Sequence, residues 1–381
     1  MRKLLLFYFL IAAGYCTSQQ GITTTDSIFH DGIIRTYITY IPPSYNPSSA
    51  SPLVLNFHGR GSNATQQYYY GDFRGIADTA GFIVVHPEGT VDQGTTHWNV
   101  GGPVLGSTVD DLGFTNALLD TLLNQYNIDA NRIYSTGMSN GGYMSFHLAC
   151  QLSDRIAAVA SVTGSMTPYT YNSCNPLHPT PIMQIHGTLD PTVPYNGDSW
   201  TKSIDEVTEY WSNFNNCNTN PNINDIPNTN LIDQSTVKQY VYNNGDNGST
   251  VEHYKVIGGG HTWPGFGIAV AATNYDIEAS IEIWRFFSQY DLNTLASSKD
   301  LNQNQIALTP NPFNHSFVIS SNQPMFGYYF LIDATGKKML NGKSNGAYQI
   351  TIDAEKINAG MYYFVLKSNN NGMLTQKIIK Q

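Results

Sequence analysis

One segment of the chain reads Arg132-Ile133-Tyr134-Ser135-Thr136-Gly137-Met138-Ser139-Asn140-Gly141, so that an apolar, β-branched run leads directly into Gly-x-Ser-x-Gly. The next residues, 142–150, have the composition of an apolar helix. A strand that turns sharply into a helix at such a serine is a nucleophile elbow, where glycines allow the strained turn and close packing of the helix on neighbouring strands. We therefore expect Ser139 to be a nucleophile held above a sheet edge.

The segments around this elbow alternate between strand and helix patterns. Six segments are predicted strands, and several of these six are short, nearly continuous apolar runs, which are typical of strands covered on both faces. The six segments are Leu53–Phe57, Phe82–His86, Arg132–Thr136, Ile156–Val162, Ile182–His186 and Val251–Ile257. Apolar spacing predicts helices over Asp111–Tyr126 and Ala279–Tyr290. The alternation predicts an α/β fold with a mostly parallel central sheet.

Two further segments of this part of the chain lie outside that alternation. Ser27–Tyr40, with a turn at Asp31-Gly32, predicts an antiparallel hairpin at the sheet edge. Asn213–Asn247 is rich in asparagine and poor in large apolar residues. We interpret it as a hydrated surface excursion rather than as a lid over a substrate.

The charge of the chain limits its partners. The formal net charge is −9, which gives no electrostatic reason to expect nucleic acid or an anionic membrane as a partner. Histidine, cysteine, aspartate and glutamate show no metal-ligand spacing, and no glycine-rich phosphate loop occurs. We therefore expect no metal and no other cofactor.

The N-terminus has the pattern of a signal peptide over residues 1–18. Arg2-Lys3 is followed by the apolar Leu4–Ala13 and by small residues near Ser18. The apolar run is too short for a resident membrane helix, and no other run is long enough to span. Cys16 suggests a lipoprotein, but the bulky Tyr15 precedes it, so we favour plain cleavage near Ser18-Gln19.

A second domain follows the first. We expect the α/β domain over 21–291, a polar linker over 292–305 and a small β-sandwich over 306–381. Turn-forming tetrapeptides separate short alternating runs in this last part. The expected strands are Phe313–Ser320, Gly327–Ile332, Tyr348–Ile352, Gly360–Lys367 and Met373–Ile379.

Signal-peptide cleavage would leave three cysteines, so at most one disulfide forms within the chain. Cys150 follows the elbow on an apolar helix and is expected to be a buried small hydrophobe. Cys174 and Cys217 lie in loop-like segments and are the better pair.

A serine nucleophile needs a base, and the base needs a group that orients it. Asp190 directly follows the run Ile182–His186, and His261 follows the run Val251–Ile257. Polar residues at the carboxyl ends of parallel strands meet at one edge of a sheet. The order Ser, Asp, His then predicts Ser139 as nucleophile, His261 as general base and acid, and Asp190 as the residue that orients His261.

Other acidic residues and histidines are weaker candidates. Asp110 and Asp111 precede Ser139 and open a helix, where capping is expected; Asp154 belongs to a turn, and Asp198 is the nearest rival to Asp190. His58 and His186 each precede a glycine at a strand end and are expected to line the cleft structurally. His30, His178 and His315 lack such a context.

Acyl transfer also needs hydrogen-bond donors for a developing oxyanion. One is the backbone N–H of Asn140, directly after the nucleophile. The other is expected in the segment His58-Gly59-Arg60-Gly61, with the Arg60 N–H as first candidate and Gly61 next. Trp98 and Trp263 are candidates to flank an acyl group, and ordinary structural tryptophans are the alternative.

These residues together resemble the secreted polyhydroxybutyrate depolymerase and feruloyl esterase group, which is related to carbohydrate esterase family 1. The matching segments are Tyr37–Pro42, Leu55–Gly59, His86–Glu88, Trp98-Asn99, Asp110–Phe114, Asn127–Tyr134, the elbow, His186–Asp190 and His261–Gly265. The resemblance implies an α/β-hydrolase that cleaves esters through Ser139, Asp190 and His261. The chain departs from it at Arg60 and in Tyr242–Ser249, where members often carry cysteine, so a disulfide of the family is not expected.

The tail resembles the type IX secretion sorting domain of Bacteroidetes proteins. The segments that carry the resemblance are Pro310-Asn311-Pro312, Asp333–Lys337, Ala359–Tyr363 and Lys377–Lys380. It implies export through the periplasm to the cell surface or the medium by the type IX machinery. A carbohydrate-binding module is disfavoured, because the aromatic residues of the tail fall within strand runs.

The first function hypothesis is therefore an extracellular serine esterase that acts through an acyl-enzyme on feruloyl or acetyl esters of plant polysaccharide. The substrate could be polymeric or small. The alternative is a polyester depolymerase that acts on polyhydroxybutyrate. More distant alternatives on the same fold are a peptidase and a surface protein that binds without catalysis.

Overall fold

The computed structural model describes residues 21–92, 94–101, 107–267, 272–295, 306–333, 337–368 and 373–381. The expected signal peptide, 1–18, lies outside these ranges, as do residues 296–305 of the expected linker. The chain divides into two compact units, one drawn mainly from residues up to Leu292 and the other mainly from Asn293–Gln381. The first four residues of the expected linker are not irregular, because Leu292–Leu295 form a short helix, α8.

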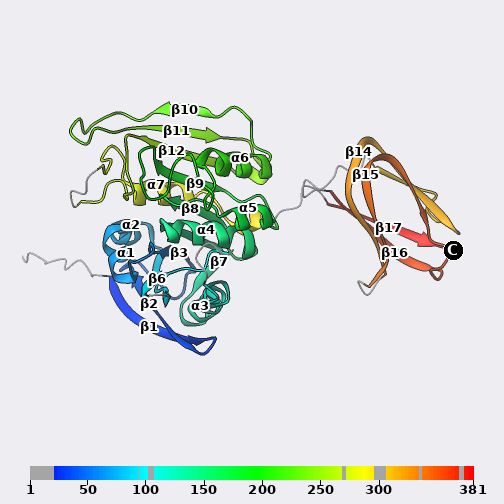
Figure 1. Cartoon of the computed structure of the whole chain (residues 1–381). Helices are drawn as coiled ribbons and strands as arrows, with labels where there is room; N and C mark the ends of the chain where they lie inside the picture. The colour runs from blue at the N-terminus through cyan, green and yellow to red at the C-terminus, as the bar shows by residue number, and fades with distance from the viewer. Residues whose placement is uncertain are drawn as a thin grey trace, which may run out of the picture. The chain divides into compact units, whose positions relative to one another are not determined.

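A ten-stranded sheet runs through the first unit (Figure 1) in the order β1-β2-β4-β3-β7-β8-β9-β12-β11-β10. The six strands from β4 to β12 in this order are parallel, and antiparallel strands continue the sheet at both edges. This confirms the predicted α/β class. The strands are β1 (Ile22–His30), β2 (Ile33–Ile41), β3 (Ser51–Phe57), β4 (Ile83–Pro87), β7 (Ile128–Met138), β8 (Ala158–Val162), β9 (Ile182–Gly187), β10 (Asn222–Asp225), β11 (Thr236–Tyr242) and β12 (Val251–Ile257).

Helices cover both faces of this sheet. Consecutive strand residues point to opposite sides, so each strand packs side chains against helices on both faces. Ile133 of β7 belongs to the core cluster that also contains Phe146 and Trp211, from α4 and α6. Its neighbour Tyr134 stacks on Phe287 of α7 at 4.9 Å between ring centroids. The helices are α1 (Ala64–Tyr70), α2 (Arg74–Ala80), α3 (Asp111–Gln125), α4 (Asn140–Gln151), α5 (Pro168–Ser173), α6 (Ile204–Phe214) and α7 (Ala279–Phe287).

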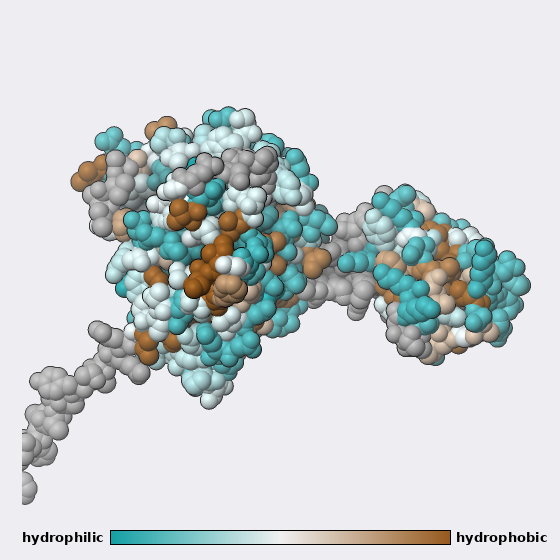
Figure 2. All heavy atoms as spheres, turned by 60° about the horizontal axis from the view of Figure 1, so that its bottom comes forward, coloured by the Kyte–Doolittle hydropathy of each residue, from teal (hydrophilic) through white to brown (hydrophobic). Residues whose placement is uncertain are grey.

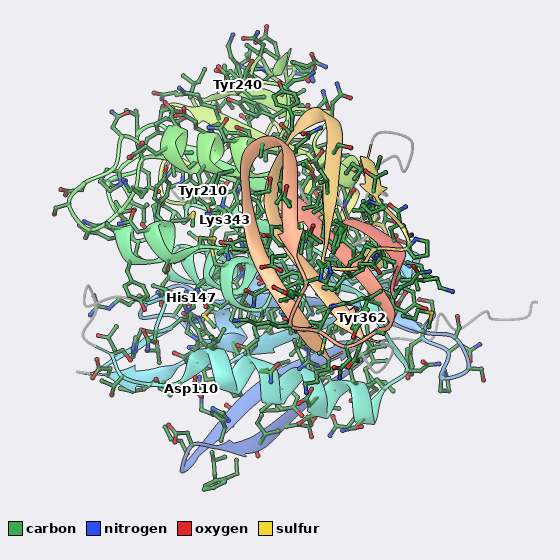
Figure 3. The ribbon with its side chains drawn as sticks, turned by 90° about the vertical axis from the view of Figure 1, so that its right-hand side faces the viewer. Asp110, His147, Tyr210, Tyr240, Lys343 and Tyr362 are labelled. Atoms are coloured by element: carbon green, nitrogen blue, oxygen red, sulfur yellow. A yellow bond between two sulfur atoms is a disulfide. The ribbon has the colours of Figure 1, made fainter. Side chains whose placement is uncertain are left out.

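Local sequence explains where several helices begin. Asp110, labelled in Figure 3, accepts a hydrogen bond from the Gly113 N–H and caps α3, as expected. Ser203 and Glu206 form a reciprocal capping box at the start of α6. These caps satisfy N–H groups that have no partner within a helix.

The two sheet edges differ in how well the sequence predicts them. The hairpin of β1 and β2 turns at Asp31 and Gly32, whose φ angles of 47° and 78° suit a two-residue turn with positive φ at both positions. At the other edge, the expected surface excursion contains β10 and β11, which the sequence analysis did not predict. Every residue of β10 is exposed, so this strand has no buried face to show in its pattern. A small separate hairpin joins β5 (Thr90–Asp92) to β6 (Thr95–His97).

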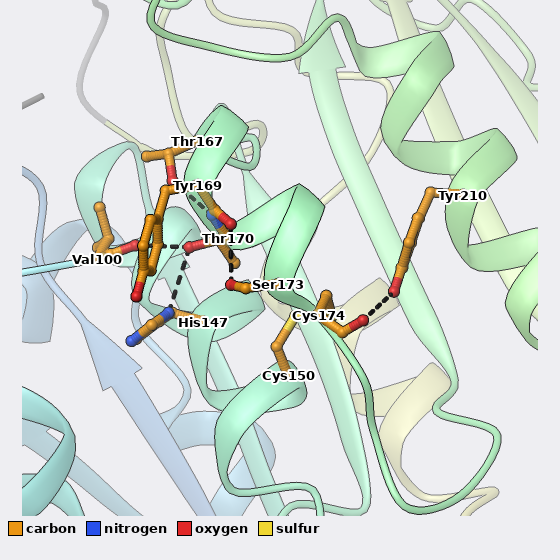
Figure 4. Close-up of a disulfide and its surroundings, with 9 residues drawn as sticks. All are labelled: Val100, His147, Cys150, Thr167, Tyr169, Thr170, Ser173, Cys174 and Tyr210. Carbon is orange, nitrogen blue, oxygen red and sulfur yellow. Dashed lines mark hydrogen bonds between the residues drawn. A yellow bond between two sulfur atoms is a disulfide. The ribbon is translucent and has the colours of Figure 1, made fainter. Parts of the chain in front are cut away.

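The disulfide prediction was wrong, because the bond joins Cys150 to Cys174 rather than Cys174 to Cys217. Cys150 lies near the end of α4, and α5 turns back across that end (Figure 4), so the two Cα atoms lie 4.7 Å apart. Thr170 of α5 also donates a hydrogen bond to the Val100 carbonyl at 2.7 Å. The disulfide and this bond hold α5 beside the helix that follows the elbow.

The second unit is an antiparallel sheet of β13 (Ile306–Thr309), β14 (Ser316–Asp333), β15 (Lys338–Asp353), β16 (Gly360–Ser368) and β17 (Met373–Lys380). The register of the long β14–β15 pair shifts between Ser320 and Met325. One half of β14 pairs with β13 and the other with β16, so the sheet folds around a core that includes Phe317 and Phe364. The O–H of Tyr362, labelled in Figure 3, donates to the Asn358 carbonyl.

Apolar residues gather in one patch near the middle of the first unit on the face drawn in Figure 2, with polar residues around it. Among the described residues, no helix is both long enough and apolar enough to cross a membrane.

Candidate active site

Ser139 stands between β7 and α4 in a strained backbone conformation. Its φ and ψ angles are 55° and −120°, a region that residues with a side chain rarely occupy. Its N–H donates to the Val162 carbonyl of β8 at 2.8 Å, which ties the turn to the neighbouring strand. The result is a serine side chain presented at the carboxyl end of the parallel strands.

Two glycines of the pentapeptide and the following Gly142 allow α4 to start against the sheet. A Cβ atom on Gly141 would lie 2.0 Å from the Phe57 carbonyl oxygen, and one on Gly137 would lie 2.5 Å from the same atom. A Cβ on Gly142 would lie 2.5 Å from Ser161 Oγ. No other residue type fits these three positions without moving β3, β8 or the helix.

Asp190 and His261 meet across the ends of two neighbouring parallel strands. Asp190 follows β9 and His261 follows β12, and Asp190 Oδ2 lies 2.7 Å from His261 Nδ1. The Asp190 side chain is fully buried, whereas the His261 side chain retains 18% of its exposure. This geometry orients the imidazole and leaves Nε2 as its second nitrogen for a proton transfer.

Asp190 is held in its ionised form by several donors. Burial alone would raise its pKa, but hydrogen bonds from His186 and His261 and from the Val193 N–H hold the pKa of Asp190 well below its usual range. The N–H groups of Thr192 and Val193 donate to Oδ1 at 2.8 and 2.9 Å. The carboxylate is therefore fixed in place and charged at neutral pH.

Two cavities of about 250 Å³ each adjoin Ser139. His261 lines the first together with Ser139, and we call it the base-side pocket. The second is lined by Ser139 with Tyr143, Val193 and Trp200, and we call it the side pocket. His261 does not line the side pocket. Ser139 thus lies between two cavities that differ in their access to the imidazole.

The loop after β3 approaches Ser139 closely, since a Cβ on Gly59 would lie 3.3 Å from Ser139 Cβ. His58 fixes this loop: its Nδ1 lies 2.8 Å from the Gly59 carbonyl oxygen, and its Nε2 accepts from the Gly89 N–H at 2.9 Å. Burial lowers the pKa of His58 to about 4, so the ring is neutral and carries its proton on Nδ1. The His58 bond orients the peptide plane between Gly59 and Arg60.

The candidate oxyanion donors are the N–H groups of Asn140 and Arg60. Their surroundings differ from those of the alternative donor, the Gly61 N–H. The Gly61 N–H donates to the Thr96 carbonyl at 2.8 Å and is therefore already engaged. Arg60 lines both pockets at Ser139. Asn140 is the first residue of α4, where the N–H groups of a helix have no partner within the helix.

Trp98 was predicted to flank an acyl group, and this prediction was wrong. Its side chain is fully buried, and its Nε1–H donates to the His58 carbonyl at 2.9 Å. The Asn140 side chain binds both backbone polar groups of Trp98. Its Oδ1 accepts from the Trp98 N–H, and its Nδ2 donates to the Trp98 carbonyl. Trp98 is a support beneath the elbow, which corresponds to the structural alternative for this residue.

The rival residues lie away from the two pockets. Asp111 is not a cap but forms a buried ion pair with Arg35 at 2.6 Å. Asp154 lies in a turn, and the exposed Asp198 accepts from the Ser199 N–H. His58 and His186 were expected to line the cleft. Both are fully buried, so neither does.

Trp263 lines the base-side pocket, as expected for a residue near the substrate, although only 3% of it is exposed. Its Nε1–H donates to Ser280 Oγ at 3.2 Å. The sequence analysis missed Tyr143 and Trp200, which line the side pocket. Tyr143 carried a signal, because it lies one turn after the elbow; Trp200 lies in a loop with no pattern that marks it.

Among the residues that the structure describes, no group of three or more histidine, cysteine, aspartate or glutamate side chains is arranged to hold a metal ion.

Comparison with known proteins gives two family matches, each over part of the chain. Residues 110–238, which contain the elbow and Asp190, match the family described as Phospholipase/Carboxylesterase. The first unit has an α/β-hydrolase fold. Residues 307–381 match the family described as Secretion system C-terminal sorting domain.

Relatives of this α/β-hydrolase include two curated proteins. A bifunctional acetylxylan esterase/xylanase of Neocallimastix patriciarum is 28% identical over 71% of this chain, which spans 36% of that protein. A feruloyl esterase B of Neurospora crassa is 28% identical over 69% of this chain and 94% of its own length. A solved acetyl xylan esterase from Aspergillus awamori covers 70% of this chain and 99% of its own, with 14% identity and a TM-score of 0.49.

Proposed function

We propose that the protein is an extracellular serine esterase that hydrolyses feruloyl or acetyl esters of plant polysaccharide through an acyl-enzyme. The observation that carries the proposal is the 2.7 Å contact of His261 Nδ1 with the buried Asp190 carboxylate, next to a pocket that His261 shares with Ser139. A base oriented by a carboxylate beside a serine on a strained elbow is the arrangement that activates a hydroxyl for acyl transfer.

The reaction proceeds in two steps. Ser139 Oγ attacks the ester carbonyl while His261 Nε2 accepts its proton, and the oxyanion is stabilised by the N–H groups of Asn140 and Arg60. His261 then gives the proton to the leaving alcohol. In the second step His261 activates water, which cleaves the acyl-enzyme and regenerates Ser139. Asp190 stays ionised throughout and stabilises the imidazolium that forms.

The substrate class is supported by the relatives, whose names describe an acetylxylan esterase and a feruloyl esterase. The side pocket supports the same assignment, because Tyr143 and Trp200 place two aromatic side chains in its lining. No described residue favours the polyester alternative over these esters.

The second unit directs export. We assign the route as passage through the periplasm followed by type IX secretion, on the basis of the sorting-domain match over residues 307–381. The protein then acts at the cell surface or in the medium.

The experiment that tests the function measures initial rates of the full chain and of its Ser139→Ala variant. The substrates are methyl ferulate, acetylated xylan and hydroxybutyrate oligomers. We expect hydrolysis of the first two and loss of at least about 10⁴-fold in the variant. Equal rates in both proteins would refute the assignment of Ser139, and preference for hydroxybutyrate would replace the polysaccharide esters by the polyester.

A further inference from the structure

A third and larger cavity, of about 750 Å³, adjoins the base-side pocket, and we call it the aromatic groove. Its lining comes from α1, α2 and α7 and from the segment Trp263–Gly267, which begins two residues after His261. Tyr69, Tyr70, Trp263, Phe266 and Trp284 supply its aromatic side chains.

The aromatic groove lies next to the base-side pocket. Tyr70, Trp263 and Phe266 line both cavities. Tyr70 and Phe266 meet edge to face at 6.1 Å between ring centroids. The groove is therefore the neighbour of the catalytic pocket on its histidine side.

The chemistry of ester cleavage decides which half of the substrate lies on that side. The bond that breaks joins the carbonyl carbon to the alcohol oxygen, and His261 gives this oxygen the proton that it took from Ser139. The alcohol must therefore leave on the His261 side, toward the base-side pocket. The acyl group then lies in the side pocket, which His261 does not line.

The groove has the lining of a site for a neutral, polyhydroxylated chain. Tyr69 is 59% exposed, and Trp284 lies flat against Phe82 at 3.9 Å between ring centroids, which fixes its orientation. Flat, fixed rings suit the apolar faces of sugar rings, and carboxylates accept hydrogen bonds from their hydroxyls. Glu278, which is exposed, provides such a carboxylate in the lining, whereas Asp72 is already paired with Arg74 at 2.7 Å.

The charges of the groove argue against other occupants. Arg285 is the cationic residue among the described lining residues, and it is already paired with Glu252 and Glu282. The groove thus offers no free cation to an anionic ligand. A polyester chain has no hydroxyls along its length for Glu278 to bind, so this carboxylate would be desolvated without compensation.

From this geometry we infer that the aromatic groove binds the polysaccharide chain that carries the ester, on the leaving-alcohol side of the reaction. The inference rests on the proposed esterase function and adds to it the location of the glycan. It also assigns Tyr69, Trp284 and Glu278, which lie outside the catalytic machinery, to recognition of the polymer.

The test compares a polymeric with a small substrate. For the full chain and its Tyr69→Ala and Glu278→Ala variants, kcat/KM is measured on feruloylated xylan and on methyl ferulate. We expect the ratio of polymer to methyl ester to fall about tenfold in Tyr69→Ala and less in Glu278→Ala, with the methyl ester rate unchanged. Tyr169→Ala removes another exposed tyrosine, on α5, and should keep the ratio. Ratios unchanged in both groove variants would overturn the inference.

A binding measurement separates this inference from the proposed function. The full-length Ser139→Ala protein is titrated with xylohexaose, which carries no ester, with and without the additional Tyr69→Ala change. Weaker binding in the double variant supports the groove even if the wild type hydrolyses none of the esters. Absence of xylohexaose binding to Ser139→Ala, or equal binding by both proteins, overturns the groove and leaves the esterase proposal standing on its own test.

Discussion

His186 Nε2 lies 3.3 Å from Asp190 Oδ2, the same carboxylate oxygen that His261 Nδ1 approaches at 2.7 Å. The proton position on His186 follows from its other nitrogen, because the Gln184 side-chain amide donates to Nδ1 at 3.0 Å. Nε2 therefore carries the proton and donates it to Asp190. It also donates to the Val193 carbonyl at 2.9 Å. His186, which is fully buried and lines neither cavity at Ser139, thus positions the Asp190 carboxylate.

We predict that His186→Ala lowers kcat by about tenfold or more while KM stays within about twofold, since a lost hydrogen bond to a charged group is worth roughly 1.5–3 kcal/mol. The His186→Gln variant keeps an N–H donor and should recover part of kcat. Steady-state kinetics on methyl ferulate check both variants, with thermal unfolding as the control for folding. A kcat of His186→Ala equal to that of the wild type would contradict the positioning role.

Two glycines give a matched test of the close packing at the elbow. A Cβ on Gly141 would lie 2.0 Å from the Phe57 carbonyl, whereas a Cβ on Gly75, in α2, meets nothing within 4 Å. We predict that Gly141→Ala lowers the free energy of unfolding by about 3 kcal/mol or more. Gly75→Ala should raise it, by up to about 0.5 kcal/mol, because alanine restricts the unfolded chain. Chemical denaturation measures both, and comparable changes in the two variants would refute the packing argument.

The sequence predicted the fold best where one physical cause controls the pattern. Val251–Ile257 is a strand with the predicted bounds: five of its seven residues are buried, and Gly258 follows it. Strand β10, Asn222–Asp225, has no such signal, because its residues are all exposed. Strand propensity depends on packing against neighbours, so a strand without a buried face is invisible in composition.

The same difference, between residues that have a sequence signal and residues that have none, applies to the site. Asp190 and His261 were selected because they follow strands, and their contact depends on backbone topology that the alternating pattern already implies. The burial of Trp98 could not be predicted, because a tryptophan beside a strand can face the core or the cleft with the same local sequence. Tyr69 and Trp284 line the same groove, and nothing in the intervening sequence indicates that they share it.

The disulfide between Cys150 and Cys174 closes a loop between residues 24 positions apart and holds α5 against α4. Replacing both cysteines by alanine should lower the free energy of unfolding by about 2–4 kcal/mol, chiefly because the unfolded chain gains conformational freedom. Cys217→Ala is the control, since it leaves this bond intact. Denaturation with and without reducing agent checks the prediction. If the reductant lowers the stability of the double variant as much as that of the wild type, another bond is responsible.

Several histidines are buried in neutral form, which makes stability depend on pH. Burial lowers the pKa of His58, His147 and His253 to about 4 and that of His86 to about 3, from the ordinary value of 6.5. In the unfolded chain these side chains take up protons below about pH 6.5, but in the folded chain they do not. The stability that they contribute is therefore present above pH 6.5 and is lost as the pH falls toward 4. The depressed pKa of Asp190 acts in the same direction but only below about pH 4.

We predict that the free energy of unfolding falls between pH 6.5 and pH 4.5, by up to about 1.4 kcal/mol per pH unit for each histidine that stays neutral in the folded state. His147 is suited to the test because its Nδ1 lies 3.3 Å from Thr170 Oγ1 and it lies outside the catalytic contacts. His147→Gln keeps a polar side chain but removes the titrating group, so its stability should depend less steeply on pH by about one histidine's share. Urea denaturation at pH 7, 6 and 5 measures both slopes. Parallel slopes for the variant and the wild type would show that His147 is not among the groups responsible, and a flat profile for the wild type would refute the prediction as a whole.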